Sequence, residues 1–239
     1  MILAVNTSTI QFSIALLKEN GTILAEYFTS AGSKNFGSFM PSIHYLLKTS
    51  KSNIQDIKAL VVTTGPGSFT GLRVGLSAAK GMAQSLQIPI IGVSSLEAMA
   101  NLLPYTNYPI CPMIHSRKGE VFTALFNCCD DHKMVRIKED TCLKFEDLSS
   151  FIEGPTLFLG NDFNKQEHVI REMLGRKALT APAHLWNLKA SSVGTLGLER
   201  FHRHNFDDLQ DLVPSYLRPP DIRPNPFTKW TLTNDTRKI

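Results

Sequence analysis

Short apolar runs and helical patterns follow one another along this chain in an order that occurs twice, and this repeat constrains the fold more than any other feature. In each half, three strand-like runs precede a helical pattern, a further strand and a second helix. Strands are predicted at residues 2–6, 11–17, 22–28, 59–63 and 90–93 in the first half, and at residues 110–114, 120–127, 134–138 and 156–160 in the second. The two sets begin about 110 residues apart. The repeat predicts an α/β protein of two similar lobes, each a mixed sheet with helices.

Helices are expected where apolar residues recur at intervals of three and four. They are predicted at residues 35–49, 70–86, 146–152, 164–174 and 191–204, with one more starting at residue 95. We therefore assign residues 1–104 to a first lobe, residues 105–218 to a second, smaller lobe, and the Pro-rich residues 219–239 to an extended or disordered tail.

Charge and composition argue against several classes of protein. The net charge is only +4 and no stripe of lysines and arginines is visible, which disfavours a dedicated nucleic-acid binder. No apolar run approaches the roughly 18 residues of a membrane helix, and no basic leader precedes Lys18. The four cysteines lack a C-x-x-C pair, so we expect reduced thiols and no metal site. A cytoplasmic protein without membrane association is predicted.

The most specific motif is the glycine-rich segment GPGSFTGLRVG at residues 65–75, between a buried strand and a helix. Free backbone N–H groups at such a turn suit a phosphate, although the segment matches neither a Walker A loop nor a G-x-G-x-x-G motif. A structural role is equally consistent, with positive φ in the turn and with Gly71 and Gly75 allowing close approach of a neighbouring helix. The weak phosphate-binding candidates are Thr7, Gly65, Gly67 and Ser68.

Residues for catalysis are harder to find. An ATPase of this design needs a carboxylate at the end of the first strand to hold magnesium, and the residue there is Asn6. His115 ends a later strand without an identifiable carboxylate partner, and neither an H-E-x-x-H nor a G-x-S-x-G motif occurs. We therefore expect no catalytic residue, metal site or cofactor in this chain.

The first two predicted helices carry more apolar surface than one sheet requires. The helix at residues 70–86 has two uncharged rows. One row suits the sheet and contains Leu72, Leu76, Ala79, Ala83 and Leu86, and the second consists of Gly71, Gly75, Ala78 and Met82. Either the two helices pack on each other, or a partner protein adds helices of its own.

Five segments together resemble the bacterial TsaB (YeaZ) family. They are ILAVNTST at residues 2–9, GPGSFTGLRVG at 65–75, IGVSSL at 91–96, RKGEVF at 117–122 and YLR at 216–218. The resemblance implies a two-lobed actin/sugar-kinase/Hsp70-like (RNase H-like) fold. It also implies a non-catalytic subunit that pairs with TsaD and works with TsaE to place a threonylcarbamoyl group on the adenosine beside the anticodon of tRNA. ATP or ADP and metal then belong to the partner subunits, and tRNA is held through the complex.

The resemblance places the docking site for TsaD on the helices at residues 35–49 and 70–86, and predicts a homodimer through the same surface when TsaD is absent. The implied partner-binding residues are Phe36, Phe39, Met40, Ile43, Gly71, Leu72, Gly75, Leu76, Ala79, Met82 and Ala83.

Two residues depart from the family pattern, which usually has Asp at the positions of Asn6 and His115. The first departure weakens any expectation of independent ATP hydrolysis. The alternative function is an autonomous ATP-dependent enzyme or peptidase of the same fold.

Overall fold

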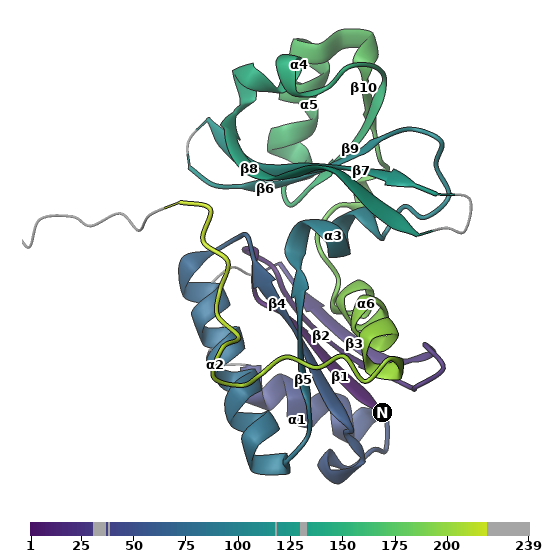
Figure 1. Cartoon of the computed structure of the whole chain (residues 1–239), viewed down its shortest axis with the longest axis vertical. Coiled ribbons are helices and arrows are strands. Elements are labelled where there is room, and N and C mark those ends of the chain that lie inside the picture. The colour runs from purple at the N-terminus through teal and green to yellow at the C-terminus, as the bar shows by residue number, and fades with distance from the viewer. Residues whose placement is uncertain (31–36, 38, 118, 130–132, 219–239) are drawn as a thin grey trace, which may run out of the picture.

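The computed structural model describes residues 1–30, 37, 39–117, 119–129 and 133–218. The predicted tail at residues 219–239 lies outside these described residues. Two lobes stand one above the other, and each is built on a five-stranded sheet (Figure 1). Among the described residues, every helix is too short or too polar to cross a membrane.

The first sheet has the strand order β3-β2-β1-β4-β5. Its β1 pairs antiparallel with β2 and parallel with β4, so the sheet is mixed as predicted. The Asn20-Gly21 turn joins β2 to β3, and Gly21 has the positive φ of 85° that such a turn requires. The strands are β1 (Ile2–Asn6), β2 (Phe12–Leu17), β3 (Ile23–Thr29), β4 (Ala59–Gly65) and β5 (Ile90–Ser94).

The second sheet repeats this topology. Its order is β10-β9-β6-β7-β8, with β6 antiparallel to β7 and parallel to β9, as β1 is to β2 and β4. The duplicated order read from the sequence is thereby confirmed, although the short β10 was not predicted. The strands are β6 (Ile110–His115), β7 (Glu120–Cys128), β8 (Met134–Lys144), β9 (Thr156–Gly160) and β10 (Ala178–Thr180).

The helices differ from the predictions mainly at their ends. Pro41 lies in the first turn of α1, where its missing N–H costs nothing, so the helix continues past it. Asp162 caps α5, just before its predicted start at residue 164, by accepting a hydrogen bond from the Lys165 amide. The helices are α1 (Phe39–Thr49), α2 (Phe69–Leu86), α3 (Ser95–Ala100), α4 (Leu148–Phe151), α5 (Phe163–Leu174) and α6 (Ala190–His202).

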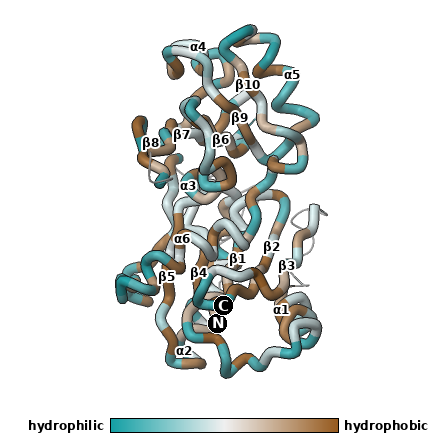
Figure 2. The backbone as a smooth tube through the Cα atoms, turned by 90° about the vertical axis from the view of Figure 1, so that its right-hand side faces the viewer, coloured by the Kyte–Doolittle hydropathy of each residue, from teal (hydrophilic) through white to brown (hydrophobic). Residues whose placement is uncertain are grey.

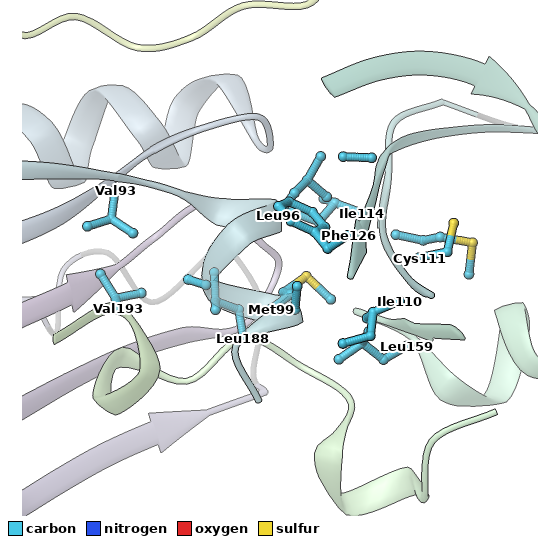
Figure 3. Packing of buried hydrophobic residues seen from close by; sticks show 14 of the residues in the cluster. Val93, Leu96, Met99, Ile110, Cys111, Ile114, Phe126, Leu159, Leu188 and Val193 are labelled. Atoms are coloured by element: carbon cyan, nitrogen blue, oxygen red, sulfur yellow. The ribbon is translucent and has the colours of Figure 1, made fainter. Parts of the chain in front are cut away.

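The lobes exchange one helix each. The helix α3 follows the first sheet in sequence but packs on strands β6 to β9, whereas α6 follows the second sheet and packs on β1, β2, β4 and β5. Figure 3 shows Leu96 and Met99 of α3 lying between Val93 of the first lobe and Ile110 of the second. The predicted boundary at residues 104 and 105 follows chain order and does not represent this exchange.

Both faces of the strands β1, β2 and β4 of the first sheet are therefore buried, whereas the edge strand β3 is half-buried to exposed. Along β1, Ile2 and Ala4 point to the core shared with α3 and α6, whereas Leu3 and Val5 point to the core beneath α1 and α2. In Figure 2, α1 and α2 lie in the lower lobe and α4 and α5 in the upper lobe. A strand covered on both faces is a continuous apolar run, which explains why these strands could be predicted.

Glycines let α6 approach the first sheet closely. A Cβ at Gly197 would lie 2.4 Å from both γ-methyl carbons of Val61, and one at Gly194 would lie 2.5 Å from Leu17 Cδ1. We expect Gly197→Ala to lower the free energy of unfolding by about 1–3 kcal/mol, because overpacking displaces the helix.

The matched control is Gly81→Ala in α2, where a new Cβ meets nothing within 4 Å. Helix propensity alone would raise the free energy of unfolding of both variants by about 0.5–1 kcal/mol. The two changes can have opposite signs only if the new methyl group at residue 197 disturbs the packing. Urea unfolding followed by circular dichroism measures both, and two stabilised variants would contradict the close packing.

The core that is shared with α3 and α6 also contains the thiol of Cys111, which cannot ionise readily. Burial raises the pKa of the Cys111 thiol to about 12, against the opposing effect of its 3.1 Å contact with Thr123 Oγ1. The thiolate is the form that alkylates. At about pH 8, iodoacetamide should therefore modify the exposed Cys129 and leave Cys111 unmodified until urea unfolds the chain, as peptide mass spectrometry would record. Equal rates of modification of Cys111 and Cys129 in the folded protein would contradict the burial of Cys111.

Candidate functional site

A cleft of about 510 Å³ separates the lobes at the ends of β1 and β6. Its walls come from the β1–β2 turn, the start of α2, the turn after β6 and the end of the described chain. They are formed by Ser8, Thr9, Ile10, Gly67, Ser68, Phe69, Ile114, His115, Ser116, Arg117, Phe122, Asn161, Ser215, Tyr216, Leu217 and Arg218. This volume lies within the range of small-molecule sites, so the chemistry of the walls decides what the cleft can do.

The glycine-rich segment packs against the β1–β2 turn. A Cβ at Gly67 would lie 2.1 Å from the Ser8 carbonyl oxygen, and one at Gly71 would lie 2.0 Å from that of Thr7. Gly75 has the same constraint, since its Cβ would lie 2.0 Å from Thr7 Oγ1. Any side chain at these positions would displace backbone or a buried hydroxyl. The glycines thus allow the predicted close approach, but what approaches is a strand turn, not a helix.

The start of α2 uses some of its N–H groups within the chain. The Ser68 amide donates to the Ser8 carbonyl at 2.7 Å, and the Gly71 amide donates to Ser68 Oγ at 3.2 Å. Gly67 and Ser68 line the cleft, as the phosphate prediction requires. Thr7, in contrast, is fully buried beneath α2, and its hydroxyl does not reach the cleft.

Asn6 holds its own turn together. Its Oδ1 accepts hydrogen bonds from the amide of Ser8 at 3.0 Å and from Ser8 Oγ at 2.7 Å. Its Nδ2 donates to the carbonyl oxygen of Leu188 at 3.1 Å, which ties the end of β1 to the segment that leads into α6. Because the side chain is fully buried and hydrogen-bonded at both ends, Asn6 has a structural role.

The cleft does not fit a magnesium-bound nucleotide. None of the described residues that line it is Asp or Glu, whereas magnesium takes carboxylate ligands together with phosphates. In the described part of the chain, no three His, Cys, Asp or Glu side chains gather as a metal site would need. His115 is exposed at the cleft, and its backbone amide donates a hydrogen bond to Asn161 Oδ1 at 2.9 Å.

Most of the predicted partner-binding residues face inward. In α1, Phe39 and Ile43 pack in the core beneath the helices, and Met40 is the exposed one, at 52%. In α2, Met82 is half-buried, and the other predicted residues are buried in this chain: Gly71, Leu72, Gly75, Leu76, Ala79 and Ala83. Phe36 lies outside the described residues. A buried side chain cannot also contact a partner, so these inward-facing residues support the surface without forming it.

The exposed residues that the sequence analysis missed lie on the outer sides of the same helices. Tyr45 of α1 is 60% exposed. On α2, Ser77 and Gly81 are exposed beside the half-buried Val74, Ala78 and Met82. These five α2 residues fall at intervals of three and four, so they form one uncharged stripe, which we call the outer stripe of α2. Helical spacing predicted that the row through Leu72, Leu76, Ala79 and Ala83 faces the sheet, and the burial of these residues confirms it. The partner-binding residues implied by the resemblance nevertheless included this inward row.

Solved structures share this architecture. "YeaZ from Pseudomonas aeruginosa" matches with a TM-score of 0.75 at 22% identity, over 90% of this chain and 99% of that one. A Clostridium difficile activator of 2-hydroxyisocaproyl-CoA dehydratase, solved with bound ADPNP, matches with a TM-score of 0.50 at 10% identity, over 85% of this chain and 97% of that one. With the duplicated sheets, these matches define the class of the fold, which is the two-lobed actin/sugar-kinase/Hsp70 type.

Sequence comparisons identify the family within that class. The family described as "TsaD: tRNA N6-adenosine threonylcarbamoyltransferase" matches residues 30–209. The "tRNA threonylcarbamoyladenosine biosynthesis protein TsaB" of Bacillus subtilis is 36% identical over 91% of this chain and 93% of its own length. The Escherichia coli protein of the same name is 38% identical over 52% of this chain and 53% of its own length. The chain belongs to the family that this model describes and, by its curated relatives, to the TsaB (YeaZ) family.

Two substitutions where the β1–β2 turn meets the start of α2 should have opposite effects on the free energy of unfolding. The Thr7 hydroxyl is buried and has no hydrogen-bond partner in the described part of the chain, so Thr7→Val should raise the free energy of unfolding by about 1–2 kcal/mol. Ser68→Ala removes the N-cap of α2 and should lower it by about 1 kcal/mol. Denaturant unfolding compares the two, and an equal loss in both would contradict the placement of Thr7.

Proposed function

We propose that this chain is a non-catalytic subunit in the biosynthesis of threonylcarbamoyladenosine in tRNA, and that it pairs with a TsaD-type catalytic subunit. The name of the Bacillus subtilis relative supports the process, since the two chains align over nearly their whole lengths. The match to a family described as a threonylcarbamoyltransferase supports a related catalytic partner.

The observation that carries the non-catalytic role is the chemistry of the cleft. Its described walls contain no carboxylate, and the amide of Asn6 occupies the end of β1 with both of its polar atoms hydrogen-bonded. Phosphoryl-transfer enzymes depend on metal ions held by carboxylates to neutralise developing charge. We therefore place ATP or ADP and metal in the partner subunits, and the chemistry with them.

The outer stripe of α2, with Met40 and Tyr45 of α1, is the surface that we assign to the partner. It exposes a methionine and a tyrosine on α1 and small residues on α2, and the small residues allow helices of another subunit to approach closely. The core beneath both helices fixes their positions, so the surface is formed before binding. We assign a homodimer to the same surface when TsaD is absent, TsaE and tRNA to the assembled complex, and the cytoplasm as the compartment.

Ser77→Arg tests this surface without disturbing the core. Ser77 is exposed in the middle of the outer stripe, so the isolated variant should fold normally. An arginine there would be desolvated on docking, and we expect binding of a TsaD subunit to weaken by at least about tenfold, on the order of 1.4 kcal/mol. Size-exclusion co-elution and titration calorimetry measure the loss.

The matched control is Ser149→Arg, an exposed helical serine in the second lobe, which should bind TsaD like the unmodified chain. In a reconstituted tRNA modification assay, omitting this chain or supplying Ser77→Arg should remove most of the product. Undiminished binding by Ser77→Arg would contradict the docking surface. Magnesium-dependent ATP turnover by the isolated chain would instead contradict the non-catalytic role.

A further inference from the structure

Beyond α6, residues 205–218 run across the molecule without forming a helix or strand of their own; we call them the C-terminal strap. Figure 1 shows the strap leaving α6, crossing β5, passing along α2 and rising to the upper lobe. It therefore starts on the first sheet and ends at the second. None of the chemistry considered above assigns it a role.

The root of the strap is fixed to the edge of the first sheet at Asp207. Its amide donates to the Ile90 carbonyl at 3.0 Å, and its Oδ2 accepts from the Gly92 amide at 2.6 Å. The guanidinium of Arg200 in α6 pairs with the same carboxylate at 2.9 Å. A Cβ at Gly92 would lie 2.6 Å from Leu212 Cδ1, so the absence of a side chain there lets the strap lie against the sheet.

Ser215 and Tyr216 bind the strap to the end of β4 and to the start of α2. The Ser215 amide donates to the Thr64 carbonyl at 2.7 Å. The rings of Tyr216 and Phe69 have centroids 5.0 Å apart, and the Arg73 guanidinium lies 3.9 Å from the centre of the Phe69 ring. Arg73 Nε also donates to the Tyr216 hydroxyl at 2.9 Å. Aromatic and cation–π contacts of this kind contribute about 0.5–1.5 kcal/mol each, so this anchor is specific.

The far end of the strap reaches the second lobe. Arg218 Nη1 donates to Glu120 Oε2 at 2.5 Å and to Ser116 Oγ at 3.3 Å. Glu120 begins β7 and Ser116 follows β6, so Arg218 is attached to the turn that forms the opposite wall of the cleft. The side chains of Arg218 and Glu120 are only 21% and 30% exposed, which reduces their screening by solvent.

We propose that the C-terminal strap is a brace that fixes the width of the cleft, with Arg218 and Glu120 as its latch. The chain itself crosses between the lobes through residues 95–109 and 181–189, on the side of α3 and α6, whereas the strap spans the side of α2 (Figure 1). Two bodies joined on one side can rotate about that side as a hinge. The hydrogen bond that Gln11 Nε2 donates to the Asn161 carbonyl oxygen at 2.8 Å already resists this rotation, and the strap adds a stronger attachment. Widening the cleft would also have to break the contacts of Tyr216 or those of Arg218.

The distance between the lobes tests the brace. Spin labels at Ser85→Cys in α2 and Ser149→Cys in α4 mark one exposed helical site in each lobe, with Cys128, Cys129 and Cys142 replaced by serine and the buried Cys111 kept. Dilution with unlabelled chain restricts the dipolar measurement to pairs within one molecule. We expect one narrow distance distribution in the parent. Arg218→Ala should widen it and lengthen its mean, and Tyr216→Ala should do the same by releasing the other anchor.

Two further variants separate a brace from a general loss of structure. The exchanged pair Arg218→Glu with Glu120→Arg should restore the narrow distribution, which a damaged fold would not do. Arg171→Ala, which removes an ion pair with Glu167 inside α5, should leave the distance unchanged. An unchanged distribution in Arg218→Ala, with circular dichroism showing an intact fold, would overturn the proposal. These measurements use no partner, so their outcome is independent of the proposed function.

Discussion

The contact between the β1–β2 turn and the start of α2 determines most of what this protein can do. Three glycines bring two backbone segments closer than any side chain would permit, and the turn consequently lies beneath the helix. That position buries Thr7 and leaves the Ser8 carbonyl as an acceptor for the Ser68 amide. The same turn orients Ser8 toward Asn6, whose side-chain amide oxygen accepts hydrogen bonds from Ser8 at the end of β1. A region that could have presented hydroxyls and N–H groups to a phosphate instead satisfies much of its polarity internally.

The exchange of α3 and α6 between the lobes explains why the outer stripe of α2 is free. Because α6 covers one face of the first sheet, α1 and α2 are needed only on the other face, where their inward rows complete the core. Within the described residues, their outward rows remain exposed or half-buried. The first sheet is thus covered by α6 on one face and by α1 and α2 on the other, and α1 and α2 turn their outward rows away from the sheet.

The local pattern of apolar residues was sufficient to predict the strands, but it did not predict how segments that are distant in the sequence pack together. The runs at β1, β2 and β4 could be predicted because burial on both faces leaves few polar residues in them. The three residues of β10 give too short a run to recognise, and they form a strand only because β9 lies beside them. The inward orientation of Leu76 and Ala79 could be predicted from helical spacing, whereas the strand turn that packs against the start of α2 could not. The strap has no periodicity, so its segment YLR could be noticed in the sequence but not placed.

The strap and the docking surface meet on one helix, and this has a mechanical consequence. Phe69 and Arg73 lie in the first turns of α2, where they hold Tyr216, and the outer stripe begins at Val74 one residue later. The second lobe, attached to the strap through Arg218, is thus linked through Tyr216 to the helix that carries the stripe assigned to the partner. A subunit that seats its helices on α2 would therefore bind next to the segment that joins the lobes, on a surface whose position is fixed by the core beneath α1 and α2.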